Sequence, residues 1–214
     1  PSAPAAGAPE GVNLDPRAFL RSPQGYNFFQ GLIGAEGMRR VLVDEFVRPA
    51  RGGRLLDIGC GTALIRARLP EMEYFGVDAD ESYLRWARAK FPSRATFKLG
   101  EAGPGFAVGL PAPFDVALGV GVLHHLDDAQ VAALFEEVRG LLSPGGRLIT
   151  LDVCYEPGQS ALSRAFVSRD RGEHVRERSR YEALASSAFR QVRATVRRDL
   201  LRVPCSHCIL ECVV

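Results

Sequence analysis

The stretch Leu55-Leu56-Asp57-Ile58-Gly59-Cys60-Gly61-Thr62 decides the fold of this chain. Residues 54–58 carry three large apolar side chains, Leu55, Leu56 and Ile58, as in a strand that is buried on both faces of a parallel sheet. Two glycines follow at once. Glycine at the carboxyl end of a first strand lets the backbone approach a ligand where a side chain would collide. The stretch therefore predicts a first parallel strand that leads into a ligand-binding turn.

Short apolar runs alternate with helical patterns on the carboxyl side of this turn. Further strands are expected at 73–77, 95–99, 114–119 and 147–152, with two late ones near 191–198 and 205–213. A helical stripe at 131–142 ends at a Ser-Pro-Gly-Gly sequence. This β-α-β-α order predicts a parallel sheet that is covered on both faces, and right-handed crossovers make it doubly wound.

Composition places the chain among ordinary globular proteins. It has 214 residues, of which 46% are hydrophobic and 24% charged, and its formal net charge is +2. We expect a disordered tail at 1–14 and one domain at 15–214. No apolar run approaches the roughly 20 residues of a membrane helix, and we locate no basic face for nucleic acid. We therefore expect a monomer or homodimer with no membrane or nucleic-acid partner.

Five cysteines are scattered along the chain, and no secretory signal precedes them. We expect reduced thiols in a cytoplasmic protein. Several thiols and other possible metal ligands share the last predicted strand: Cys205, His207, Cys208, Glu211 and Cys212. Alternate side chains of a strand point to opposite faces, so neither face offers four converging ligands. We expect no metal site.

Three acids lie near the ends of the first three strands. Asp57 precedes the glycines, Asp78 ends the second strand, where a carboxylate can accept both hydroxyls of a ribose, and Glu101 follows the third. Dinucleotide sites usually carry a third glycine where this chain has Leu64. An acid ahead of the glycines suits the ammonium group of S-adenosylmethionine, so the sequence favours this cofactor over NAD. The structural alternatives are a buried, hydrogen-bonded Asp57 and a helix-capping Asp78.

Five blocks of sequence between about residues 40 and 152 resemble the class I S-adenosylmethionine-dependent methyltransferases of the small-molecule type. The blocks are Leu55 to Thr62, Gly76-Val77-Asp78, Phe114-Asp115-Val116-Ala117, Val122-Leu123-His124-His125-Leu126 and Leu142-Ser143-Pro144-Gly145-Gly146-Arg147-Leu148. The resemblance implies an α/β fold: a doubly wound, Rossmann-like sheet of about seven mostly parallel strands, with an antiparallel last strand, in three α/β/α layers.

The same resemblance implies which residues bind S-adenosylmethionine. They are Asp57, Gly59, Cys60, Gly61, Asp78, Ala79, Glu101, Ala102, Gly119 and Val120. Asp78 is expected at the ribose, Glu101 and Ala102 beside the adenine, and the backbone at 119–120 along the methionine portion. The chain departs from the family at Ala63, where a third glycine is frequent, and at Glu101, where aspartate is commoner.

The catalytic candidates follow the fourth and fifth strands. Methyl transfer from a sulfonium needs chiefly the alignment of the reacting atoms, and a base only where the nucleophile loses a proton. The candidates are His124, His125, Asp152 and Tyr155. Histidine titrates near neutral pH and suits the role of base. A local hydrogen-bonding role for the two histidines is the alternative.

The acceptor side is expected in an insertion at 155–188 and under lid helices at 15–50. The substrate candidates are Tyr26, Gln159, Arg164, Arg169 and Arg171. Arginine pairs bidentately with carboxylate and phosphate, so the acceptor can be anionic. The alternatives are a solvated helix end in which neighbouring acids satisfy the arginines, and ordinary packing of the segment around Tyr26.

The sequence thus predicts transfer of a methyl group from S-adenosylmethionine to an oxygen or nitrogen of a small molecule, with S-adenosylhomocysteine as the product. Two other functions fit parts of the pattern. One is a protein that binds S-adenosylmethionine and catalyses a non-methylating conversion. The other is an NAD-dependent oxidoreductase, against which the missing third glycine counts.

Overall fold

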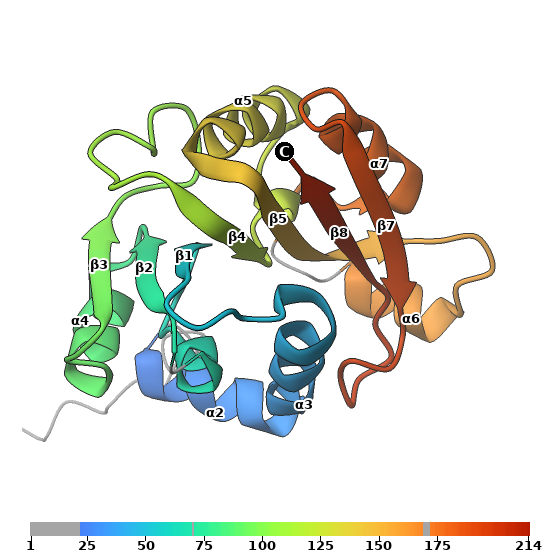
Figure 1. Cartoon of the computed structure of the whole chain (residues 1–214). Coiled ribbons are helices and arrows are strands. Elements are labelled where there is room, and N and C mark those ends of the chain that lie inside the picture. Colours follow the sequence, from blue (N-terminus) through green and yellow to red (C-terminus); the bar gives the residue numbers. More distant parts are fainter. Residues whose placement is uncertain (1–21, 70, 169–171) are drawn as a thin grey trace, which may run out of the picture.

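The computed structural model describes residues 22–69, 71–168 and 172–214 (Figure 1). The expected tail at 1–14, the start of the expected lid, and both Arg169 and Arg171 lie outside the described residues.

A mixed sheet forms the centre of the molecule, with the strand order β3-β2-β1-β4-β5-β8-β7 and β6 paired to β5 off this path. The strands are β1 (Arg54–Ile58), β2 (Glu73–Asp78), β3 (Ala95–Leu99), β4 (Phe114–Val120), β5 (Leu142–Tyr155), β6 (Arg176–Glu177), β7 (Gln191–Arg197) and β8 (His207–Val213). β1 to β5 pair in parallel, and β8 is antiparallel to both of its neighbours. The predicted fold class is confirmed.

Helices cover both faces of this sheet (Figure 1). They are α2 (Pro23–Leu32), α3 (Ala35–Val41), the π-helix η1 (Leu42–Val47), the 3₁₀ helices η2 (Leu64–Arg68) and η3 (Leu123–His125), α4 (Glu81–Lys90), α5 (Asp128–Leu141), α6 (Ala161–Val167) and α7 (Arg178–Ser186). One core packs α5 and α7 against the sheet, and the other packs α3, η1 and η2.

Alternate residues of each central strand enter opposite cores. Leu55 lies in the core under α3 and Leu56 in the core under α5, and the neighbouring Leu118 and Ala117 divide in the same way. Because both faces of the strands are covered, both sets of side chains must be apolar. The uninterrupted apolar strands of the sequence follow from this arrangement.

Two elements differ from their predicted bounds. The predicted strand at 147–152 belongs to a longer β5, because Leu142 already pairs with Phe114 before a register shift carries the chain to Arg147. Gly145, with φ of 76°, lies in the irregular part. The described part of the expected lid helices at 15–50 ends in the π-helix η1, a form that is rare and mostly occurs as a single turn.

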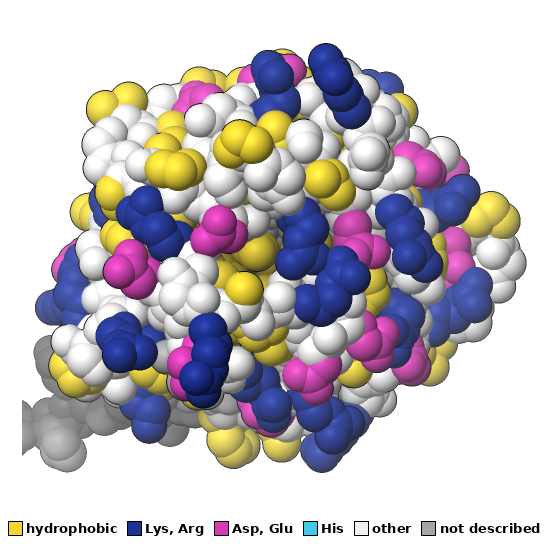
Figure 2. Space-filling model, viewed as in Figure 1, with side chains coloured by type: hydrophobic (Ala, Val, Ile, Leu, Met, Phe, Trp, Pro, Cys, Tyr) yellow, Lys and Arg dark blue, Asp and Glu magenta, His cyan; other side chains and the backbone are white. Residues whose placement is uncertain are grey.

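The surface carries both signs of charge. On the face shown in Figure 2, basic and acidic side chains are interspersed rather than gathered into one field. Within the described residues, no helix combines the length and apolar composition needed to cross a membrane.

Candidate functional site

A cavity of about 450 Å³ opens at the carboxyl edge of the parallel strands. Its lining comes from α2, α3, α4, the ends of β4 and β5, η3, the segment after β7, and the start of β8: Tyr26, Phe29, Gln30, Ile33, Met38, Tyr83, Val120, Gly121, His124, His125, Leu151, Val153, Leu201 and His207. A second cavity of about 60 Å³ shares Tyr26, Gln30, Met38 and Val120 with it and reaches the glycine turn. Doubly wound sheets bind their ligands at this edge.

The glycine turn has the backbone conformation that the sequence predicts. Gly59 and Gly61 have φ of 67° and 53°, which glycine adopts without strain. A Cβ atom at Gly59 would lie 2.7 Å from Cγ2 of Val122, so no larger residue fits there. Ala63 also has a positive φ, of 53°. The residue that replaces the third glycine of the family thus takes a conformation in which glycine is favoured.

Asp78 fixes the glycine turn from the neighbouring strand. Its Oδ2 accepts a hydrogen bond of 2.7 Å from the Gly61 amide, and its Oδ1 accepts one of 2.9 Å from the Asp80 amide. Burial raises the pKa of Asp78, and these bonds oppose the shift. Asp80, which accepts from the Ser82 amide at 2.7 Å, is the residue that caps α4. The alternative of Asp78 as the helix cap is therefore wrong.

Asp57 is buried beneath the turn and accepts a hydrogen bond from the Tyr74 hydroxyl. Burial raises the pKa of Asp57 to about 7, the nearby charge of Asp78 adds to the increase, and the Tyr74 hydrogen bond opposes it. The small cavity is also lined by Asp57, so the carboxyl borders the space beside the glycines. A group that titrates near neutral pH in a cleft is a feature of many functional sites.

Helix α2 lies over the glycine turn. The ring of Tyr26 is 3.9 Å from the position that a Cβ atom of Gly61 would take, and it packs on Tyr83 with 5.2 Å between ring centroids. Burial raises the pKa of Tyr26 to about 12, so its hydroxyl keeps its proton at neutral pH. The Thr62 hydroxyl donates to Oδ1 of Asn27 at 2.6 Å. Helix α2 therefore packs directly on the glycine turn, and its role as a lid stays a prediction.

His124 and Asp152 form a buried pair beside the larger cavity. Nδ1 of His124 lies 2.8 Å from Oδ1 of Asp152, which also accepts the backbone amides of Leu123 and His124 at 2.8 and 3.2 Å. Since a carboxylate only accepts, Nδ1 is the donor and Nε2 is the basic nitrogen. Asp152 does not line the cavity and acts on it through His124. His125 is exposed, with its ring centroid 4.2 Å from that of His124.

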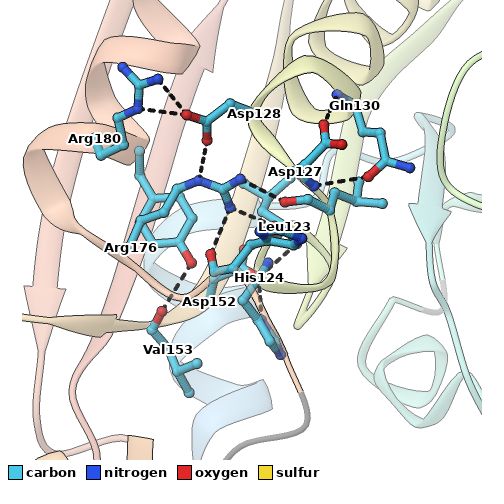
Figure 3. A network of polar contacts seen from close by, with 12 residues as sticks. Leu123, His124, Asp127, Asp128, Gln130, Asp152, Val153, Arg176 and Arg180 are labelled. Carbon is cyan, nitrogen blue, oxygen red and sulfur yellow. Dashed lines mark hydrogen bonds and ion pairs between the residues drawn. The ribbon is translucent and has the colours of Figure 1, made fainter. Parts of the chain in front are cut away.

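Arg176 fixes the turn that carries His124 (Figure 3). Its guanidinium donates to the carbonyls of Leu123, Leu126 and His174 at 2.6 to 2.8 Å. It also donates to Oδ1 of Asp128 at 2.7 Å, and Asp128 further binds the exposed Arg180. This network joins β6 and α7 to η3. Sequence reasoning assigned no role to Arg176.

Several predicted site residues lie away from the larger cavity. Glu101 is exposed, Gly119 borders only a void of about 10 Å³, and the guanidinium of Arg164 stacks on the Tyr155 ring at 5.1 Å. Gln159 lies in a separate cavity of about 230 Å³, where it donates to the Ser163 hydroxyl at 2.9 Å. Neither cavity beside the glycine turn is lined by these four residues.

The remaining predicted cofactor residues differ in their surroundings. Cys60 borders the small cavity, but its sulfur also lies 2.7 Å from where a Cβ atom of Gly76 would be. Burial raises the pKa of its thiol. Ala79 borders neither cavity, and the partly buried Ala102 packs against the core under α5.

Two lining residues escaped the sequence analysis although the sequence carries a signal for each. Arg39 is 9% exposed, borders the small cavity beside Asp57, and donates to Oε1 of Gln30 at 3.1 Å. It occupies a position on the buried stripe of its helix, four residues after Ala35.

His207, the second of these lining residues, was considered in the sequence only as a metal ligand. Among the described residues no cluster of three or more histidine, cysteine or acidic side chains has the geometry to hold a metal.

Comparison with known proteins gives one family match. Residues 56–148 match a family model described as a methyltransferase domain. The trans-aconitate 2-methyltransferase of Methylobacterium radiotolerans is 39% identical over 105 residues, which are 47% of this chain and 38% of that protein. This chain spans about half the length of two other methyltransferases that it resembles in sequence.

Solved structures share the fold at low sequence identity. The pyocyanin biosynthetic protein PhzM superposes with a TM-score of 0.70 and 15% identity, over 92% of this chain and 61% of its own. The [4+2]-cyclase SpnF superposes with a TM-score of 0.62 and 18% identity, over 82% of this chain and 80% of its own. At such identities these likenesses establish the fold alone.

Proposed function

We propose that this protein, whose residues 56–148 match a methyltransferase-domain model, transfers the methyl group of S-adenosylmethionine to an oxygen or nitrogen of a small molecule. The observation that carries this proposal is the larger cavity. It runs from Tyr26 and Tyr83, beside the glycine turn, to the imidazole of His124. A cofactor side and a proton-accepting side chain thus border one cavity.

The residues at the glycine turn fit the proposed cofactor. Gly59 lets the turn pack closely on Val122, and Gly61 leaves its side of the turn without a side chain beneath the ring of Tyr26. Each oxygen of Asp78 accepts one backbone amide and has capacity for one ribose hydroxyl. Arg39 and Asp57 border the small cavity with charges that suit the carboxylate and ammonium of the methionine portion. When bound, S-adenosylmethionine supplies a methyl group activated by its sulfonium.

We assign His124 the role of base. The Asp152 hydrogen bond fixes its ring, and Nε2 takes the proton that an acceptor hydroxyl or amine loses. Asp152 is a positioning residue because its carboxylate meets the imidazole and not the cavity. Arg169 and Arg171, the predicted partners of an anionic acceptor, lie outside the described residues.

Cofactor binding tests the first half of the proposal. We expect Asp78→Ala to weaken S-adenosylmethionine binding by about 1–3 kcal/mol, because it removes charge-assisted hydrogen bonds to the ribose. Isothermal calorimetry with S-adenosylmethionine and S-adenosylhomocysteine measures this, with NAD as the competing ligand. Two control variants accompany Asp78→Ala. Asp78→Asn keeps a hydrogen-bond acceptor for the Gly61 amide, and Asp80→Ala removes only the side-chain cap of α4. Unchanged affinity in Asp78→Ala, or tighter binding of NAD, would contradict the assignment.

Cofactor affinity is expected to depend on pH through Asp57. Its pKa of about 7 means that the carboxyl is protonated at pH 6 and ionised at pH 8, and only the ionised form attracts an ammonium group. We therefore expect S-adenosylmethionine to bind about tenfold more tightly at pH 8 than at pH 6. Calorimetry across this range measures the change. The dependence should vanish in Asp57→Asn and for methylthioadenosine, which lacks the ammonium; its persistence in either case would refute the role of Asp57.

The raised pKa of Asp57 also has a consequence for stability. The folded state binds the Asp57 proton more tightly than the unfolded state does. The stabilisation of the fold by this proton is therefore complete below the pKa of the unfolded chain, which is about 4. It is lost as the pH rises through about 7.

A non-methylating conversion at the same site is the second candidate function, because the cyclase SpnF shares the fold. Product analysis by mass spectrometry, in which a gain of one methyl group supports methyl transfer, separates the two.

A further inference from the structure

We propose that the methyl acceptor is a neutral, largely apolar molecule that binds against β5 and β8, with His207 as the hydrogen-bonding partner of its polar group. This inference rests on the function proposed above and names the class of acceptor that the site admits. It differs from the anionic acceptor that the sequence alone suggests.

The sheet order separates a cofactor side of the cavity from an acceptor side. The glycine turn and Asp78 follow β1 and β2, whereas β5 and β8 lie on the other side of β4 (Figure 1). Tyr26 and Tyr83 border the cavity near the glycine turn, and Leu151 and Val153 border it from β5. A molecule that enters the cavity from the side of β4 opposite the glycine turn therefore meets β5 and β8 first.

The acceptor side is apolar. Apart from histidines, its lining is formed by Phe29 and Ile33 from the α2 segment, Leu151 and Val153 from β5, and Leu201 from the segment between β7 and β8. That segment is held against α2 by the Arg202 amide, which donates to the Ile33 carbonyl at 2.8 Å. The side chains thus enclose a space from three directions, as in sites for apolar ligands.

No arginine, lysine or carboxylate of the described chain lines this cavity. A charged group that leaves water for such a site loses much of its hydration, and the polar side chains of the described lining are those of histidine, tyrosine and glutamine, which carry no fixed charge. Arg164, the described arginine that the sequence assigns to an anionic acceptor, stacks on Tyr155 and is absent from the lining. The lining therefore selects against a carboxylate or phosphate and favours a neutral acceptor.

His207 supplies the polar contact on this side. It is the first residue of β8 and 3% exposed. Because β8 runs antiparallel to β5, its beginning lies at the edge where the parallel strands end, and His207 pairs with Val153. Both residues line the cavity. An imidazole can donate and accept a hydrogen bond, so it can bind a neutral hydroxyl or carbonyl group.

Three single-ring probes test the charge preference: 4-ethylphenol, 4-ethylbenzoate and ethylbenzene. They differ in one substituent, which is neutral and polar, anionic, or absent at pH 7. Ligand-observed NMR titrations are made on the full chain, with and without saturating S-adenosylhomocysteine, whose binding is measured by calorimetry on the same sample. We expect 4-ethylphenol to bind at least about tenfold more tightly than 4-ethylbenzoate. Preference for 4-ethylbenzoate, equal affinities, or binding of neither probe would overturn the proposal.

Variants then locate the probe. His207→Phe should weaken 4-ethylphenol about fivefold or more and leave ethylbenzene unchanged, because a hydrogen bond is lost while the ring remains. His207→Gln should restore part of the loss. Leu201→Arg should improve 4-ethylbenzoate by placing a cation at the lining, and Arg164→Ala should change none of the affinities. Equal losses of affinity for 4-ethylphenol and ethylbenzene in His207→Phe would refute the role of His207. Loss of 4-ethylbenzoate binding in Arg164→Ala would refute the neutral acceptor.

The two levels of proposal fail separately. If S-adenosylhomocysteine does not bind, the proposed function fails. The charge preference of the cavity is then still measured by the probe titrations made without S-adenosylhomocysteine. If S-adenosylhomocysteine binds but the anionic probe is preferred, the methyltransferase proposal stands and the acceptor class is wrong.

Discussion

His124→Gln is expected to lower kcat for methyl transfer by about 10²- to 10⁴-fold while leaving S-adenosylmethionine affinity nearly unchanged. The imidazole borders the cavity with Nδ1 committed to Asp152, so its loss removes the proton acceptor but no contact at the glycine turn. Labelled S-adenosylmethionine, with a neutral phenol or amine acceptor found by screening, measures kcat, and calorimetry measures cofactor binding.

Three further variants distinguish a base from a structural histidine. Asp152→Asn keeps the shape of the pair and should produce a smaller loss in kcat than His124→Gln, and the double variant should lose little more than His124→Gln alone. His125→Gln, on the exposed neighbour, is the matched control and should retain most of the turnover. Wild-type kcat in His124→Gln would remove the base from the mechanism, and parallel losses of kcat and thermal stability would make the histidine structural.

Arg176→Met is expected to reduce the free energy of unfolding by about 3–5 kcal/mol. The guanidinium is buried and satisfies three backbone carbonyls and one oxygen of Asp128, and methionine keeps the stem but none of these bonds. The Leu126 carbonyl would then lose the guanidinium as its donor, and the Leu123 carbonyl would keep only the Leu126 amide at 3.2 Å. Thermal and urea unfolding measure the effect, which corresponds to a decrease in Tm of roughly 6–20 °C.

Arg180→Met is the matched control for Arg176→Met. Both arginines bind Asp128, but Arg180 is exposed, so its loss should cost under about 1 kcal/mol. Similar unfolding free energies for the two variants would mean that the bonds to the turn carry little of the stability. The wild-type protein and Arg176→Met should also differ in turnover, since the Leu123 carbonyl that Arg176 binds belongs to the turn that presents His124.

The sequence predicted the central strands β1, β4 and β5 well because their apolar side chains enter the cores on both faces of the sheet. Asp78 and the glycine turn could be placed because adjacent parallel strands bring residues at their carboxyl ends together. The strand β6 could not be predicted, since a pair of residues, Arg176 and Glu177, has no periodicity to detect. The longer β5 escaped because Pro144 and two glycines resemble a loop.

The acceptor side was less accessible to sequence reasoning. The arginines after β5 were chosen because charged residues near a crevice suggest a ligand, yet where Arg164 points depends on its stacking on Tyr155. Arg39 and His207 reach their cavities from elements that are distant in the sequence from the glycine turn. Their contribution depends on how α3 and β8 pack, which local patterns do not determine.

The placement of β8 between β5 and β7 has a consequence for biosynthesis. A nascent chain that ends at Arg197 already contains β1 to β5 and β7, but β7 has no strand to pair with until β8 is made. During this interval the apolar edge of β5 stays open, and unpaired edges of this kind favour association between chains. We therefore expect translation to pass residue 213 before the sheet closes, and variants that slow the insertion of β8 to aggregate in cells even where the purified folded protein is stable.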